Sequence, residues 1–93
     1  MAKFYFTYGQ SDRQPFKGGW TEVEAANAED ACRAFRLVHP DRTPGILNCA
    51  GIYTEEQFRN TAMHNDHRGN FDRFCVERIT FTHEIIDDKE TET

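Results

Sequence analysis

The sequence lacks the long apolar runs that membrane proteins require. No stretch approaches the roughly 18 consecutive apolar residues of a transmembrane helix, and no apolar segment typical of a secretory signal follows Met1. Cys32, Cys49 and Cys75 are odd in number and widely spaced, unlike the disulfide framework of a small secreted domain. We therefore predict reduced thiols, a cytoplasmic location and no membrane partner.

Basic residues are also few. Lysine and arginine total 11 against 16 acids, which gives a formal net charge of −5. The last ten residues hold five acids and one lysine, so residues 1–83 carry a net charge of only −1. We predict a single domain over residues 1–86 followed by an acidic, flexible tail over residues 87–93. This charge balance disfavours a strongly basic face, so we predict that the protein does not bind long nucleic acid directly.

The sequence contains no recognisable catalytic motif. A glycine-rich phosphate loop is absent, because the Gly18-Gly19 pair precedes a predicted strand rather than a helix. We therefore predict that the protein is not an enzyme. The alternative is a thiol enzyme, in which a cysteine acts beside a histidine base. The residues available for that alternative are Cys49, Cys75, His64 and His67.

The clearest structural signal is a strand that runs directly into a helix over residues 46–63. Residues 46–53 are almost continuously apolar, which predicts a central strand covered on both faces. Thr54 and Gln57 have the spacing of a capping box, and Tyr53 and Phe58 have that of a hydrophobic staple. The helix is therefore expected to begin directly after Thr54.

The remaining elements follow from period and capping signals. Alternating apolar residues predict strands, and Asn27 followed by acids in the next turn predicts a helix that ends near Pro40. A long loop, rich in turn formers, separates the first two strands, and loops of this length often have a function. The predicted strands cover residues 3–8, 20–25 and 74–86, the first helix begins after Asn27, and the long loop covers residues 9–19.

The element order β-β-α-β-α-β predicts an α+β fold. We expect a two-layer sandwich in which both helices pack on one face of a four-stranded sheet. The other face would then lack a helical cover, with Tyr5 and Trp20 exposed on it. A bare apolar sheet face commonly meets another subunit or a ligand, so we predict a homodimer or a higher oligomer.

Two cysteines and two histidines form the candidate metal site. Two thiolates and two imidazoles could complete a tetrahedral zinc site, although the spacing lacks a Cys-x2-Cys knuckle. Two buried thiols and two solvated histidines are the alternative. No cofactor is predicted unless zinc binds at Cys49, His64, His67 and Cys75.

Aromatic and arginine residues form the candidate binding site. The chain contains eight Phe, three Tyr and one Trp, more aromatic residues than a small core requires. Aromatic faces beside arginines could stack a base and bind a phosphate. The alternative is that Trp20 belongs to the core and the arginines to a solvated loop. The predicted ligand or partner contacts are Trp20, Tyr53, Arg68 and Arg73.

Four segments of the chain carry a resemblance: KFYFTYG, PFKGGWTEVEA, AEDACRAFRLVHPDR and ILNCAGIYTEEQFRNTAM. Together they span roughly residues 3–63, and residues 74–79 add a weaker likeness. In the order and the amino-acid sequence of these segments, the chain resembles small uncharacterised proteins encoded by phages and prophages of Gram-positive bacteria. The resemblance implies no residue roles. It implies a phage accessory protein in a bacterial host cell, a group that includes anti-CRISPR proteins and sponges for immune signalling nucleotides.

These observations give three functional hypotheses. The first is a non-enzymatic counter-defence protein that binds and neutralises a host defence protein, such as a CRISPR nuclease. In the second, the protein sequesters a small immune signalling nucleotide at an oligomer interface. In the third, it is a zinc-stabilised structural or regulatory module.

Overall fold

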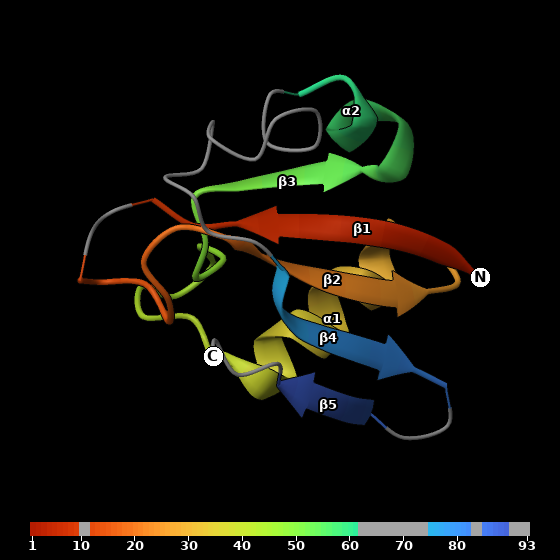
Figure 1. Ribbon diagram of the computed structural model, residues 1–93. Helices are drawn as coiled ribbons and strands as arrows, with labels where there is room; N and C mark the ends of the chain where they lie inside the picture. The colour runs from red at the N-terminus through yellow and green to blue at the C-terminus, as the bar shows by residue number, and fades with distance from the viewer. Residues whose placement is uncertain (10–11, 62–74, 83–84, 90–93) are drawn as a thin grey trace.

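The described residues form a mixed sheet with two helices (Figure 1). The structure is a computed structural model that describes residues 1–9, 12–61 and 75–82, and the backbone of residues 85–89. In chain order the elements are β1 (Ala2–Thr7), β2 (Trp20–Ala25), α1 (Ala28–Val38), β3 (Gly51–Thr54), α2 (Glu55–Arg59), β4 (Cys75–Phe81) and β5 (Ile85–Lys89). The strand order is β3-β1-β2-β4-β5. Among the described strands, β2 and β4 pair as parallel neighbours and the other pairs are antiparallel. The predicted α+β class is confirmed.

The main core lies between the sheet and α1. Alternation along β1 directs Phe4 and Phe6 to this face, followed by Tyr8. Phe6 stacks on Phe35 of α1, with ring centroids 4.4 Å apart. Complete burial of side chains of this size stabilises the fold by about 1.5–3 kcal/mol each. The same cluster contains Val23, Ala25, Ala31, Ala34, Val76 and Ile79.

The opposite face of the sheet carries a smaller aromatic cluster, made by Tyr5, Trp20 and Phe58. Tyr5 stacks on Phe58 of α2 with ring centroids 4.2 Å apart. Because Tyr5 alternates with Phe4 and Phe6, α2 covers the face that α1 does not. The prediction that both helices share one face, and that Tyr5 and Trp20 are bare, is therefore wrong. Thr54 both ends β3 and caps α2, so no connecting segment is available to carry α2 to the other face.

The local helix signals predicted from the sequence are present. The side chain of Asn27 accepts a hydrogen bond of 2.8 Å from the Asp30 backbone N–H at the start of α1. Thr54 and Gln57 form both hydrogen bonds of the capping box at the start of α2. Each cap satisfies backbone N–H groups that have no partner within the helix.

The apolar segment 46–53 is mostly a loop, which contradicts the predicted central strand. Only residues from Gly51 onward form β3, which lies at one end of the sheet order, and Ile46 is 61% exposed. Arg36 of α1 binds Asp41, whose side chain accepts from the Gly45 N–H, and this holds the preceding turn against α1. An apolar run by itself does not distinguish a strand from a loop that packs onto a core.

The predicted strand over residues 74–86 is two strands, β4 and β5, which pair as antiparallel neighbours. The predicted domain boundary at residue 86 therefore falls inside β5. Asp87, Asp88 and Lys89 belong to that strand, and the rest of the predicted tail lies outside the described residues. The alternation of apolar and polar residues runs through residues 74–86 without a break. No glycine or proline in this segment indicates that one strand ends and another begins.

A polar network crosses the main core beside α1. The hydroxyl of Thr21 and the Nε2 of His39 both bond Oε1 of Glu77, at 2.9 and 2.7 Å. Since Thr21 uses its hydrogen for Glu77, Tyr8 donates to the Thr21 oxygen, at 2.5 Å. Glu77 has no exposed surface. These bonds reduce the cost of burying a carboxylate in the core.

Candidate functional site

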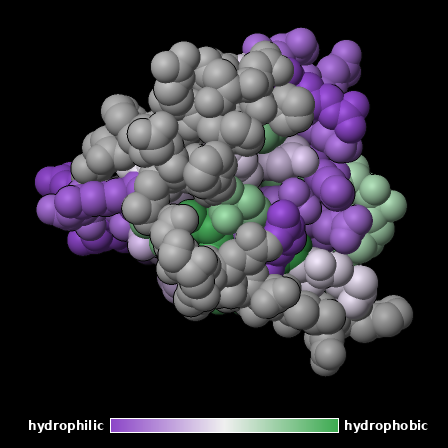
Figure 2. All heavy atoms as spheres, in the orientation of Figure 1, coloured by the Kyte–Doolittle hydropathy of each residue, from purple (hydrophilic) through white to green (hydrophobic). Residues whose placement is uncertain are grey.

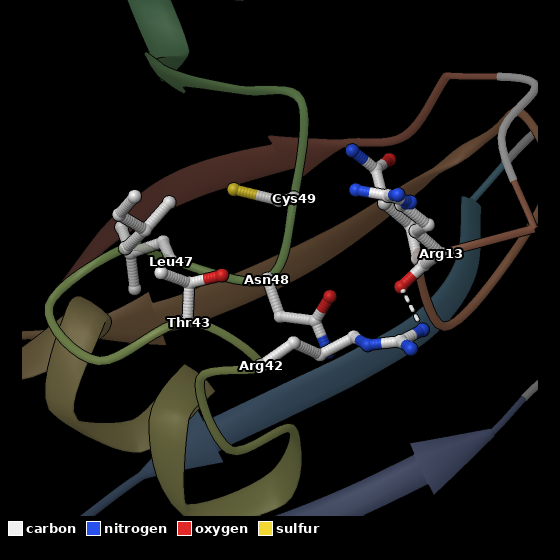
Figure 3. Close-up of a pocket in the computed structure, with 8 residues that line it drawn as sticks. Arg13, Arg42, Thr43, Leu47, Asn48 and Cys49 are labelled. Atoms are coloured by element: carbon white, nitrogen blue, oxygen red, sulfur yellow. Dashed lines mark hydrogen bonds between the residues drawn. The ribbon is translucent and has the colours of Figure 1, made fainter.

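A pocket lies at the end of the sheet where β1 ends, between the loop of residues 9–19 and the loop that precedes β3 (Figure 3). The first loop is closed at its base by two backbone hydrogen bonds, from Gly18 N to Gly9 O and from Tyr8 N to Gly19 O. Gly18 and Gly19 have φ values of 71° and 74°, which glycine adopts without the usual steric cost. The neck of the loop therefore depends on the glycine pair.

The two loops are joined across the pocket by arginine. The Nη1 of Arg42 donates a hydrogen bond of 2.7 Å to the carbonyl oxygen of Arg13, and Figure 3 shows this bond. The pocket has a volume of about 380 Å³, within the range of small-molecule sites. We call it the arginine pocket. The described residues that line it are Arg13, Gln14, Arg42, Thr43, Ile46, Leu47, Asn48 and Cys49.

The arginine pocket is basic within an acidic chain. None of the described lining residues is acidic, although Asp12 and Asp41 directly precede the two arginines in sequence. Asp12 is 2.8 Å from the Lys17 ammonium, and a hydrogen bond from Lys17 lowers the pKa of its carboxyl. Asp41 is 2.9 Å from the Arg36 guanidinium. Both neighbouring carboxylates are therefore engaged by other cations, and Arg42 forms no ion pair within the described residues.

Figure 2 shows the surface in the orientation of Figure 1. Hydrophilic side chains gather at the end of the molecule where the loop after β1 projects. Arg13 is exposed there and Gln14 is half-buried. A charged ligand could reach this end of the sheet without crossing the core.

Two amide side chains in the pocket have orientations fixed by the backbone. The Oε1 of Gln14 accepts a hydrogen bond of 2.9 Å from the Gly9 N–H, so its NH₂ group remains as the second polar end of that side chain. The Nδ2 of Asn48 donates to the Pro40 carbonyl at 3.4 Å, and its Oδ1 is the opposite end. The pocket thus combines an amide donor with an amide acceptor.

The other side of the pocket is apolar. In Figure 3, Leu47 and the sulfur of Cys49 lie on the side away from Arg13. Both residues are half-buried and also pack against the main core. Burial raises the pKa of the Cys49 thiol to about 11, with a further contribution from Cys32. Cys49 is therefore a neutral thiol near pH 7, which suits an apolar wall better than a nucleophile.

The structure brings together only some of the predicted contact residues. Trp20 and Tyr53 both contact Phe58, with ring centroids 4.9 and 6.3 Å apart. Trp20 is 6% exposed, so it serves the core rather than an open surface. The predicted partners Arg68 and Arg73 lie outside the described residues.

The two predicted zinc ligands that the structure describes, Cys49 and Cys75, lie apart from each other. Cys49 packs against the main core on the α1 side, whereas Cys75 packs against the aromatic cluster on the opposite face. The sheet separates these two thiols, so one tetrahedral ion cannot bind both. Within the described part of the chain, no three His, Cys, Asp or Glu residues form a group that could hold a metal. His64 and His67 fall in the segment that is not described.

Of the residues that line the arginine pocket, sequence reasoning singled out only Cys49, as a candidate zinc ligand or nucleophile, and missed the others. The available signal was the length of the loop over residues 9–19, which predicted a function but gave no residues for it. Arg42 and Asn48 lie in segments interpreted as a turn and as a strand. Their meeting with Arg13 depends on a contact between loops that are 29 residues apart in sequence.

None of the helices in the described part of the chain has the length and apolarity needed to cross a bilayer. Comparisons of the chain with protein-family models, with curated proteins and with solved structures gave no significant match. The arginine pocket is therefore interpreted from its own chemistry.

Proposed function

We propose that the protein is a non-enzymatic binding protein that sequesters a small anionic ligand in the arginine pocket. The observation that carries this proposal is that both Arg13 and Arg42 line a pocket whose described lining contains no acid. Guanidinium groups bind phosphates and carboxylates through two parallel N–H bonds. Such a site selects anions in a chain whose net charge is −5.

The construction of the pocket supports binding rather than turnover. The half-buried Cys49 is a neutral thiol near pH 7, because burial raises its pKa to about 11. The wall of the pocket that contains Cys49 therefore offers apolar contact to a ligand, but only a weak nucleophile for a reaction.

The phage setting implied by the resemblance gives this binding a purpose. A protein that withholds a small signalling molecule from a bacterial defence system needs affinity and no catalytic step. The alternative, capture of a defence protein by aromatic anchors, has less support, because Trp20 is 6% exposed. Anchors of that kind insert into pockets of the partner and need an accessible ring.

Native mass spectrometry of protein purified gently from a bacterial host tests the proposal, followed by calorimetry with ribose 5-phosphate as a minimal anionic probe. We expect a retained small ligand or measurable binding of the probe. Arg42→Leu should reduce the affinity by about tenfold or more, because a charge-assisted hydrogen bond is lost.

Arg59→Leu is the matched control, since Arg59 is exposed on α2 and pairs with Glu55. It should bind the probe like the wild-type protein. Two results would overturn the proposal: a wild-type protein with neither retained ligand nor affinity for the probe, or equal losses in the two arginine variants.

A further inference from the structure

We infer that the ligand of the arginine pocket is a nucleotide, whose base is bound by Gln14 and Asn48 and whose phosphate is bound by the arginines. The inference rests on the proposed function and specifies the class of ligand. Three features of the pocket carry it: the fixed amide groups, the apolar wall and the arrangement of these groups relative to the arginines.

The amide groups have defined hydrogen-bonding roles. Gln14 uses its oxygen on the Gly9 N–H and presents its NH₂ group, whereas Asn48 uses its nitrogen on the Pro40 carbonyl and presents its oxygen. A ligand that satisfies both must carry an acceptor and a hydrogen-bond donor. A fully ionised dicarboxylate has no donor, and a sugar phosphate has hydroxyl donors but no flat apolar face for the apolar wall of the pocket. On its Watson–Crick edge every nucleobase has both a donor and an acceptor, and its ring is flat.

The apolar wall fits the faces of a planar ring. Leu47 and Cys49 lie on the side of the pocket away from Arg13, and the side chain of Asn48 extends between them and the arginine (Figure 3). A ligand that spans these groups has an apolar part, a hydrogen-bonding edge and an anionic end. Nucleotides combine these three parts in one molecule of a size that suits pockets of this class.

The specificity follows from the cost of leaving the two amide groups unpaired once a bound ligand excludes water from them. A base whose N–H group is blocked or turned away would leave the Asn48 oxygen without a donor. The loss of one such hydrogen bond reduces affinity by about tenfold. The arginines, in contrast, contribute equally to every phosphate ester. The two parts of the pocket can therefore be tested separately.

The experiment compares ribose 5-phosphate with the four ribonucleoside 5′-monophosphates by calorimetry on the full chain. We expect at least one nucleotide to bind about tenfold or more tightly than ribose 5-phosphate. Asn48→Leu should weaken the binding of the preferred nucleotide by more than it weakens the binding of ribose 5-phosphate, so that most of the preference is lost. With the wild-type protein, a nucleotide that is methylated at the base nitrogen carrying the N–H should lose the same preference over ribose 5-phosphate. This test does not depend on the folding of a variant.

The outcomes separate this inference from the proposed function. If ribose 5-phosphate and all four nucleotides bound with equal affinity, and Arg42→Leu abolished the binding of each, the nucleotide assignment would be overturned. The proposed anion-binding function would still be supported. The nucleotide assignment would also be overturned if Asn48→Leu and Gln14→Leu both kept the wild-type preference for a nucleotide. If no probe bound, the proposed function and the nucleotide assignment would fail together.

Discussion

The Nε2 of His39 lies 2.7 Å from the Oε1 of Glu77, a carboxylate with no exposed surface. The histidine side chain is itself only 12% exposed. Phe16 and Phe35 contact its ring, at centroid distances of 5.8 and 5.3 Å. Glu77 thus ties the end of α1 to β4 inside the main core.

Replacement of Glu77 by alanine should destabilise the protein by about 3–5 kcal/mol, because the donors of Thr21 and His39 lose their acceptor. Urea unfolding measures the change. Glu24→Ala is the control: Glu24 lies on the face away from α1 and is half-exposed, so the effect should stay within about 0.5 kcal/mol. Similar losses in the two variants would contradict the structural role of Glu77.

Two positions on α1 test which side of the helix meets the sheet. Phe35 is fully buried against Phe6, and Leu37 is 66% exposed. Phe35→Ala should reduce the free energy of unfolding by about 3–5 kcal/mol. Leu37→Ala should change it by no more than about 0.5 kcal/mol. The reverse order of effects would mean that α1 packs with a different face.

Tyr5 makes the stability sensitive to alkaline pH. Burial, with the nearby Glu22 carboxylate, raises the pKa of Tyr5 from 10.0 to about 12. The unfolded chain releases this proton at lower pH than the folded protein, so stability should fall as the pH rises from about 10 to about 12. In Tyr5→Phe, which keeps the ring on Phe58, the decline measured by urea unfolding at successive pH values should be shallower. An identical decline would show that Tyr5 is not its source.

The thiols test the alternative of a thiol enzyme. Burial raises the pKa of Cys49 to about 11 and also raises the pKa of Cys75. Both should react slowly with iodoacetamide at neutral pH and faster as the pH rises, because only the thiolate attacks. Mass spectrometry of the labelled peptides gives each rate, with urea-unfolded protein as the reference. Reaction of either folded thiol faster than the unfolded reference at pH 7 would revive the thiol enzyme.

The separation of Cys49 and Cys75 by the sheet tests the zinc module. If the thiols are independent, the changes in melting temperature from Cys49→Ser and Cys75→Ser should add in the double variant. A shared metal would instead make either single change nearly as damaging as both. The same comparison in the presence of a chelator separates metal loss from packing loss.

The parts of the fold that depend on neighbouring residues could be predicted from the sequence. β2 has the predicted bounds, and the caps at Asn27 and Thr54 form as expected. Each of these features is specified within a few residues by alternation or by a side chain that bonds a nearby N–H group.

The features that depend on distant contacts could not be predicted. The loop over residues 46–50 keeps its shape partly because Arg36 holds Asp41, and the side of the sheet that α2 covers becomes evident only when Phe58 meets Tyr5. The arginine pocket needs a hydrogen bond between Arg42 and a backbone carbonyl, which leaves no trace in residue spacing. Composition therefore predicts a binding function, whereas the residues of the proposed site become evident only from tertiary contacts.

The glycine neck at residues 18 and 19 has a consequence for how the protein can evolve. The loop it closes is held at its base by backbone bonds to Gly9 and Tyr8, so its tip can change in sequence or length while β1 and β2 keep their register. Loop insertions cost little entropy once the ends are fixed. The wall containing Arg13 and Gln14 could thus be remodelled for a different ligand while the sheet stays unaltered.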